Sequence, residues 1–270
     1  MTFSEMNCFE KTFAHRRVCA YPASTSDCYL DADVPVVYSL EFEERGEELL
    51  AACDVMGCAP FHLVTVSGLH WDEELSPWQA GLIVSRDDHF TGEAADTVEF
   101  LTQEVIPWAE EVLPLQRKEW PEEQGNESKD KRPEDVLPSQ GKECPRVGQR
   151  RILSGYSMAG LFALYAGFKT DEFSALVSAS GSLWFPDIVP FVEKNELSSA
   201  IKSAYFSIGD KESRTRNLWM KITEQNTRHI SELLHQRGVI TTFALNPGNH
   251  FTDTVLREAK GICWVLENVF

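Results

Sequence analysis

The sequence predicts an α/β protein built on a mostly parallel central sheet with helices on both faces. Short apolar runs bounded by turn residues alternate with longer segments of helical periodicity, which is typical of this class. The chain has 270 residues, 43% of them hydrophobic, enough for one sizeable core. It contains no apolar run of the roughly 18 residues that a membrane-spanning helix needs. We therefore expect a single domain over residues 1–270 and no membrane partner.

The expected strands are short and rich in β-branched or aromatic residues. Arg16–Ala20 is expected to belong to an early hairpin. The later strands are brief and apolar, as buried parallel strands are. We expect them at Val34–Leu40, His62–Val66, Arg151–Leu153, Ala175–Ser178, Tyr205–Ile208 and Thr242–Leu245.

Three long segments have helical periodicity. Thr97–Leu113 places apolar residues three or four positions apart, and we expect Pro107 to kink it. Leu218–His235 repeats the pattern and is followed by Gly238, a residue that commonly ends helices. Thr254–Val269 closes the chain as a third helix. We expect the apolar faces of all three to contact the core.

The segment Gln116–Gln149 differs from the rest in composition. It contains four prolines, balanced charges and few apolar residues, too few to offset the entropy lost on ordering. We expect a mobile surface insertion here. A lid over the site and a tolerated surface loop are both open interpretations.

The charge of the chain is strongly acidic and unevenly distributed. The formal net charge is −17, and all of the excess lies in residues 1–114. Such a surface repels phosphate backbones and anionic lipids. We therefore expect no nucleic-acid partner.

The cysteines predict neither a disulfide framework nor a metal site. Their number is odd, they include no C-x-x-C pair, and no Cys/His spacing fits zinc. The amino terminus also lacks the basic start and apolar stretch of a signal peptide. We therefore expect reduced thiols in a cytoplasmic protein. The seven cysteines are Cys8, Cys19, Cys28, Cys53, Cys58, Cys144 and Cys263.

The strongest motif is a strand, a tight turn and a helix around a serine. An apolar strand runs into G-Y-S-M-A-G, and an apolar helix follows, which is the context of a nucleophile elbow. Gly155 and Ala159 supply the small neighbours that a strained turn at Ser157 needs. The helix amino terminus favours developing negative charge, so the Met158 amide is an expected oxyanion donor. The alternative is a Gly/Ser turn without catalysis.

A base and an acid follow in the chain order of such a site. His250 lies in N-P-G-N-H-F directly after the strand expected at Thr242–Leu245. Two carboxylates, Asp210 and Glu212, follow the preceding strand in G-D-K-E. We expect Glu212 to be the acid because it stands three residues after the strand-ending glycine, with Asp210 as the alternative.

These motifs resemble a family of esterases on the α/β-hydrolase fold. G-Y-S-M-A-G-L-F-A-L-Y-A, S-G-S-L-W-F-P, G-D-K-E and N-P-G-N-H-F look like segments of enterochelin-type siderophore esterases, feruloyl esterases and S-formylglutathione hydrolases. The resemblance covers residues 34–270 apart from the insertion. S-G-S-L-W is its most diagnostic piece, although Phe185 stands where siderophore esterases carry a second tryptophan.

The resemblance implies roles for individual residues. Ser157 would be the nucleophile, His250 the base and Glu212 the acid. The second oxyanion donor would be the amide of Phe42, although the family usually has Asp-Gly where this chain has Glu41-Phe42.

The resemblance also implies an aromatic substrate pocket. Trp184 belongs to S-G-S-L-W, and Trp71 and Trp78 lie in segments that match a loop bordering the pocket. His70 is a candidate pocket wall, and a core position is equally open for Trp78. Such a pocket suits a flat or apolar acyl group.

The sequence therefore predicts a serine esterase that cleaves a small-molecule carboxylic ester through an acyl-enzyme, without a cofactor or a metal. Siderophore-type and aryl or feruloyl esters are the candidate substrates. An acyltransferase with the same triad and a non-catalytic binding protein on this fold are the alternatives. The sequence predicts no particular oligomeric state.

Overall fold

Eight strands form one sheet in the computed structural model, which describes residues 8–23, 34–81, 83, 89–113 and 150–269. The sheet order is β1-β2-β4-β3-β5-β6-β7-β8. The strands are β1 (Phe9–Phe13), β2 (Arg16–Tyr21), β3 (Val36–Leu40), β4 (His62–Ser67), β5 (Arg151–Tyr156), β6 (Ala175–Ala179), β7 (Ser203–Gly209) and β8 (Ile240–Asn246). The insertion expected at 116–149, with its two interpretations, lies outside the described residues.

The sheet is mostly parallel, as predicted. β1 and β2 form the expected antiparallel hairpin, and β2 pairs antiparallel with β4. Every other pairing is parallel. The seven strand predictions are confirmed, with ends that shift by up to three residues.

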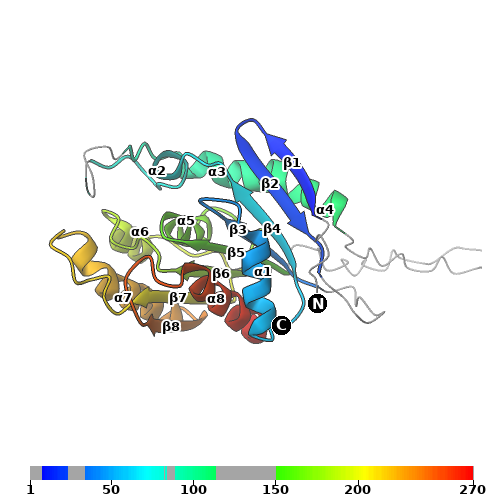
Figure 1. The fold of residues 1–270 in the computed structure, drawn as a ribbon. Coiled ribbons are helices and arrows are strands. Elements are labelled where there is room, and N and C mark those ends of the chain that lie inside the picture. The colour runs from blue at the N-terminus through cyan, green and yellow to red at the C-terminus, as the bar shows by residue number, and fades with distance from the viewer. Residues whose placement is uncertain (1–7, 24–33, 82, 84–88, 114–149, 270) are drawn as a thin grey trace, which may run out of the picture.

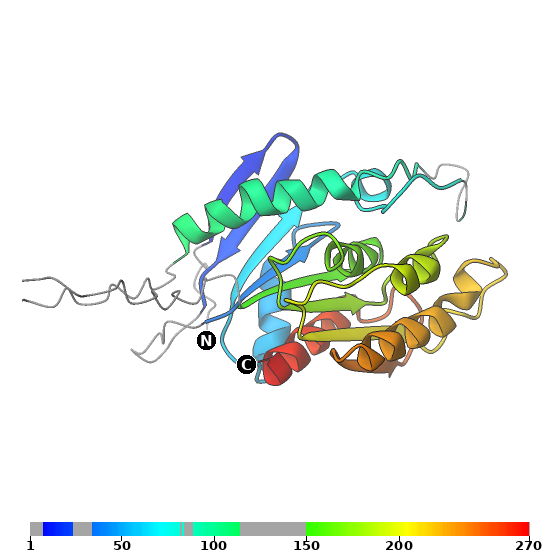
Figure 2. The same cartoon turned by 180° about the vertical axis from the view of Figure 1, so that it is seen from behind.

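Helices cover both faces of the sheet. α1 (Gly46–Val55) and α8 (Thr254–Val269) lie together on one face (Figure 1), and α3 to α7 lie on the other (Figure 2). These are α3 (Ala94–Phe100), α4 (Ile106–Val112), α5 (Met158–Ala166), α6 (Ile188–Lys194) and α7 (Thr223–Gln236); α2 (Trp71–Glu74) precedes them. Each face has its own cluster of buried apolar side chains.

The helix expected at Thr97–Leu113 is present, but its irregularity lies before the proline. A turn of π-helix, η1 (Leu101–Val105), separates α3 from α4. Pro107 is the second residue of α4, which continues directly from η1, so the π-turn lies immediately before the residue that lacks a backbone N–H. The predicted core positions Val98, Leu101, Val105 and Trp108 are buried.

The helix expected at Leu218–His235 begins later than predicted. Leu218 is 79% exposed, so its expected core position is wrong. The side-chain oxygen of Asn217 accepts hydrogen bonds from the Trp219 and Met220 amides and starts the short helix η3 (Met220–Ile222). α7 itself begins at Thr223 and ends near Gly238, which has a positive φ of 90°.

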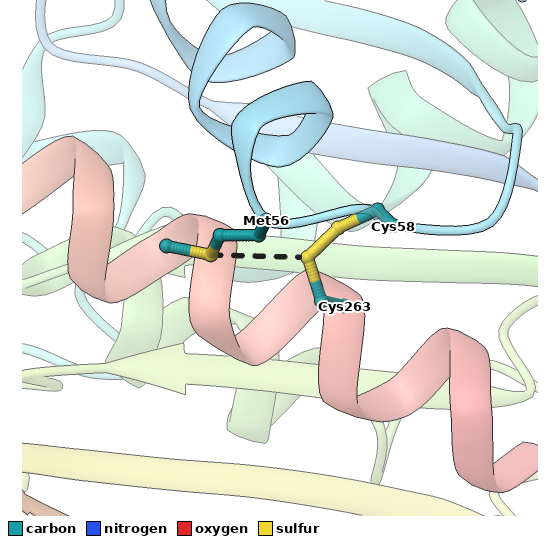
Figure 3. The surroundings of a disulfide bond; sticks show 3 residues. All are labelled: Met56, Cys58 and Cys263. Carbon is teal, nitrogen blue, oxygen red and sulfur yellow. Dashed lines mark hydrogen bonds between the residues drawn. A yellow bond between two sulfur atoms is a disulfide. The ribbon is translucent and has the colours of Figure 1, made fainter.

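A disulfide joins Cys58 to Cys263, so the expectation of reduced thiols is wrong for this pair (Figure 3). The two residues are 205 positions apart, with Cα atoms 5.0 Å apart. No spacing in the sequence predicts it, because the packing of α1 against α8 creates the proximity. The free cysteines among the described residues are Cys8, Cys19 and Cys53.

Within the described part of the chain, no helix is long and apolar enough to cross a membrane.

Candidate active site

The predicted site residues gather at one edge of the sheet. Ser157 directly follows β5, Glu212 lies three residues beyond β7 and His250 lies four residues beyond β8. β5 to β8 are parallel neighbours, so their carboxyl ends meet at the same edge. The sheet therefore brings together three side chains that are far apart in the sequence.

The turn at Ser157 is strained and crowded. Ser157 has φ 60° and ψ −120°, and α5 begins at the next residue. A Cβ on Gly155 would lie 2.5 Å from Ala159, and one on Gly160 would lie 2.9 Å from the Cα of Gly181. These contacts require small residues around Ser157 and explain the G-Y-S-M-A-G sequence.

Ser157, His250 and Glu212 form one hydrogen-bonded chain. The Nε2 atom of His250 lies 3.0 Å from the Oγ atom of Ser157, and its Nδ1 atom lies 2.7 Å from Glu212 Oε2. A carboxylate beside Nδ1 favours the tautomer with its proton on that nitrogen. Nε2 is then free to accept the serine proton.

Glu212 is held as a carboxylate. Burial by itself would raise its pKa, but hydrogen bonds from His250, the Gly209 amide and Ser180 keep the pKa below its usual value. The amide of Gly209 lies 2.6 Å from Oε1, and the hydroxyl of Ser180 lies 2.9 Å from it. A negative charge therefore faces His250.

The buried Arg257 completes the surroundings of Glu212, and the sequence analysis missed it. Its Nη1 atom lies 2.9 Å from Glu212 Oε1 and 3.1 Å from the hydroxyl of Ser180. Nη2 donates to the carbonyl of Pro247, the residue directly before the Gly-Asn-His turn. The only signal in the sequence is an arginine among the apolar residues of the last helix, and it does not indicate which way the side chain points.

Tyr156 is a second residue that the sequence analysis missed. Its hydroxyl donates to the carbonyl of His250 at 2.7 Å and accepts from Arg257 at 3.2 Å. Its ring lies 5.4 Å from the His250 ring. Tyr156 thus fixes the backbone of the residue that faces Ser157.

Asp210, the alternative acid, has a different contact. Its Oδ1 atom accepts the Gly248 amide at 2.8 Å, and its own amide donates to Asn246. Asp210 therefore ties the end of β7 to the turn that carries His250, while Glu212 is the carboxylate in contact with the imidazole.

The two expected oxyanion donors stand on neighbouring elements. Met158 is the first residue of α5, where a helix leaves its amides without helical partners. Leu40 of β3 pairs with Gly155 of β5, and Phe42 lies two residues beyond Leu40 as Ser157 lies two beyond Gly155. Phe42 and Ser157 therefore follow the carboxyl ends of two neighbouring parallel strands.

Two of the expected pocket residues, Trp71 and its sequence neighbour His70, lie near Phe42. The Trp71 ring meets the exposed Phe42 ring edge to face at 5.5 Å. The exposed side chain of His70 lies with its ring 4.6 Å from that of His15.

The other two expected pocket residues belong to a second aromatic group. Trp184 is buried and packs with Trp78 around Phe185. The indole N–H of Trp78 donates to the carbonyl of Pro186 at 3.1 Å. Trp78 also lines a cavity of about 350 Å³ with Phe191, and the cavity lining includes no residue of the serine–histidine–glutamate chain.

The S-G-S-L-W segment contacts the nucleophile turn directly. The amide of Ser182 donates to the carbonyl of Ser157 at 2.9 Å, and the two hydroxyl oxygens are 3.4 Å apart. Ser182 therefore supports the turn, while Trp184 anchors the same segment in the core.

Comparison with known proteins finds a relative by sequence and a set of solved structures with a similar fold. No family model matches the chain. The uncharacterized protein YbbA of Bacillus subtilis (strain 168) is 22% identical over 236 residues, covering 85% of this chain and 82% of its own length.

The structural neighbours are esterases and serine hydrolases. The siderophore hydrolase EstB from Aspergillus nidulans has a TM-score of 0.70 at 16% identity, with 99% of this chain and 96% of its own covered. An IroE-like serine hydrolase from Shewanella oneidensis has a TM-score of 0.69 at 15% identity, with 98% and 81% covered.

The enterobactin esterase FES from Shigella flexneri has a TM-score of 0.65 at 17% identity. Its alignment covers 99% of this chain, which spans 61% of the length of that esterase. The sheet order, the strained serine turn and these neighbours agree with the motifs, and the chain has the α/β-hydrolase fold of the siderophore esterases that it resembles.

Proposed function

We propose that this protein is a serine esterase that cleaves a carboxylic ester through an acyl-enzyme. One observation carries the proposal: the Ser157, His250 and Glu212 side chains form a continuous hydrogen-bonded chain of 3.0 and 2.7 Å at the elbow. The esterases among the structural neighbours support the same reading.

The reaction proceeds in two halves. Ser157 Oγ attacks the ester carbonyl carbon while its proton passes to His250 Nε2. The tetrahedral intermediate collapses, and His250 returns the proton to the departing alkoxide, leaving the acyl group on Ser157. Water then gives up a proton to His250 and attacks the acyl carbon. The bond from this carbon to Ser157 Oγ breaks, His250 returns the proton to Oγ, and the acid is released. Glu212 stabilises the imidazolium in both halves.

The amides of Met158 and Phe42 hold the negative oxygen of each tetrahedral intermediate. Met158 donates from the amino terminus of α5, where the helix dipole favours an anion. Phe42 donates from the loop after β3, the parallel neighbour of the strand that leads to Ser157. No cofactor takes part in these steps.

The substrate is an ester with a flat aromatic group. The side chain of Phe42, whose amide is a proposed oxyanion donor, is 68% exposed, and that of Phe251, next to His250 in the sequence, is 85% exposed. The Phe251 ring lies 5.2 Å from the His250 ring, and Trp71 backs Phe42. Exposed aromatic side chains beside a nucleophile provide stacking surface for an aryl or catechol ester.

Labelling with a fluorophosphonate probe tests the proposal. Wild-type protein is expected to be labelled at Ser157, as located by peptide mapping, and Ser157→Ala is expected to lose the label. Asp210→Asn leaves Ser157, His250 and Glu212 in place, serves as the matched control and is expected to retain labelling. Absence of label on folded wild-type protein would favour a binding protein.

Turnover assays identify which ester is cleaved and whether water or an alcohol accepts the acyl group. Aryl acetates, feruloyl esters and catechol-siderophore esters are compared as substrates, with product analysis in the presence of glycerol. The free acid is the expected product. A glycerol ester as the main product would identify an acyltransferase instead.

A further inference from the structure

Four sulfur atoms gather between the end of α1 and the middle of α8. The Sγ atoms of Cys53, Cys58 and Cys263 all lie within 4.8 Å of one another. The Sδ atom of Met56 lies 4.0 Å from Cys263 Sγ, and Figure 3 shows Met56 and Cys58 on the same side of α8 as Cys263. The proposed esterase mechanism uses none of these residues.

The backbone of the α1 end explains why three of these sulfurs meet. The Met56 amide donates to Ala52 O and the Cys58 amide donates to Cys53 O at 3.1 Å, so the chain curls back at the end of the helix. Gly57, with φ 71°, allows this tight turn. Cys53, Met56 and Cys58 thereby face α8.

The environment of the cluster suits a soft cation. Cys53 is buried, whereas Met56, Cys58 and Cys263 are half-buried. A metal ion can therefore reach the cluster from solvent on the side of these three residues, while the Cys53 side is closed. Leu49, Ile262 and other apolar side chains surround the inner side. The group of ligand atoms contains sulfur alone, without imidazole or carboxylate.

We propose that these four sulfurs form a binding site for one Cu(I) ion when Cys58 and Cys263 are thiols. Thiolate and thioether ligands favour Cu(I), whereas hard cations prefer oxygen. A thioether is outside the usual nitrogen, thiolate and carboxylate ligands of zinc, so Met56 favours Cu(I) over Zn(II).

The Cys58–Cys263 disulfide must be reduced before Cu(I) can bind, and a dithiol can serve as the reductant. The dithiol passes two electrons and two protons to the Cys58–Cys263 disulfide and becomes a disulfide itself. The bond between the two sulfurs breaks and two thiols form. Cu(I) then binds without a change of oxidation state, and each thiol that coordinates releases its proton to solvent.

Competition with a chromogenic Cu(I) chelator tests the site. The full chain is used with Cys8→Ser, Cys28→Ser and Cys144→Ser, so that the thiols of these three residues do not compete. After reduction by dithiol and removal of the reductant without oxygen, the protein is expected to withdraw one equivalent of Cu(I) from the chelator. The oxidised form, with its disulfide confirmed by mass spectrometry, is expected to withdraw none.

Two substitutions and one control locate the ligands. Cys53→Ser and Met56→Leu are each expected to weaken Cu(I) binding by at least about tenfold, since even changes in residues around metal ligands have such effects. Cys19→Ala removes a buried thiol outside the cluster and is expected to leave the affinity unchanged. Circular dichroism of each variant confirms that it is folded.

Thermal unfolding gives a readout independent of the chelator. Binding to the folded state raises the melting temperature, so Cu(I) is expected to stabilise the reduced protein and not the Met56→Leu variant to the same extent. Failure of the reduced protein to compete, unchanged affinity in folded Cys53→Ser or Met56→Leu, or tight binding of Zn(II) in place of Cu(I) would each overturn the assignment.

Discussion

At the scale of single residues, two carboxylates two positions apart have separate tasks. Glu212 contacts the imidazole of His250, while Asp210 accepts the amide of Gly248 in the turn before it. Glu212 also accepts hydrogen bonds from the Gly209 amide and the Ser180 hydroxyl, which hold its carboxylate beside the imidazole.

Substitution of the two acids separates these tasks. Glu212→Gln is expected to lower kcat/KM for an aryl acetate by about 10⁴, because the amide stabilises neither the required tautomer nor the imidazolium. Asp210→Asn keeps an acceptor for Gly248 and is expected to lower kcat/KM less than about tenfold, the size of one modest hydrogen-bond change. Equal losses in the two variants would contradict the assignment of Glu212.

At the scale of elements, α8 connects two parts of the site. Arg257 extends from it to Glu212, and the adjacent Glu258 extends to the hydroxyls of Ser39 and Ser154 at 2.8 and 2.6 Å. Ser39 also donates to Glu41, the residue before Phe42. One turn of one helix thus contacts both the proposed acid and the strand end before the proposed oxyanion donor.

Removal of the Arg257 charge should destabilise the fold. Arg257→Met leaves Glu212 buried without its cation, and breaking a buried pair in this way costs about 3–5 kcal/mol. The free energy of unfolding, measured in urea, is expected to fall by this amount. Arg257→Lys is the matched control, since it keeps the charge and should recover part of the loss. A fall below about 1 kcal/mol, the range of exposed pairs, would mean that the pair is not buried in solution.

The carboxyl of Glu258 should make stability depend on pH. Burial and the nearby Glu41 raise its pKa from 4.5 to about 8 in the folded state. Between these values the unfolded chain has released the proton and the folded chain has kept it, so the free energy of unfolding falls as pH rises, by at most about 1.4 kcal/mol per pH unit.

Glu258→Gln tests this sign. The variant cannot ionise at position 258, so its unfolding free energy is expected to fall less than that of the wild type between pH 5 and pH 8. Urea titrations at both values measure the difference. Glu48→Gln, at an exposed acid of α1, controls for the general loss of negative charge. Parallel curves for wild type and Glu258→Gln would show that Glu258 is ionised throughout.

At the scale of the whole molecule, the disulfide joins the segment after the first helix to the last helix. Cys58 and Cys263 are 205 positions apart, so the bond restricts a large part of the unfolded chain. Dithiothreitol, without added metal, is expected to lower the free energy of unfolding by about 2–4 kcal/mol. The double variant Cys58→Ser/Cys263→Ser should have the lower stability already and should not respond to the reductant.

Much of the fold and of the candidate site is predictable from local sequence. Strand patterns are visible because buried parallel strands need continuous apolar runs, and Ser157 is visible because its strained turn demands Gly155 and Ala159. His250 follows from its place after the last strand. Leu218 shows the limit of periodicity, since the side chain of Asn217 diverts the backbone into another turn before α7 begins.

The sequence by itself determined the fold class, the strand positions, the serine turn and the chain order of the proposed nucleophile, acid and base, because each depends on neighbours a few residues away. Only the tertiary structure decided which carboxylate meets His250, that Arg257 and Tyr156 brace the site, and that Cys58 bonds to Cys263. These outcomes depend on the register of parallel strands and on the packing of α1 against α8, which bring together side chains up to 205 positions apart. Local patterns contain no information about such distant contacts.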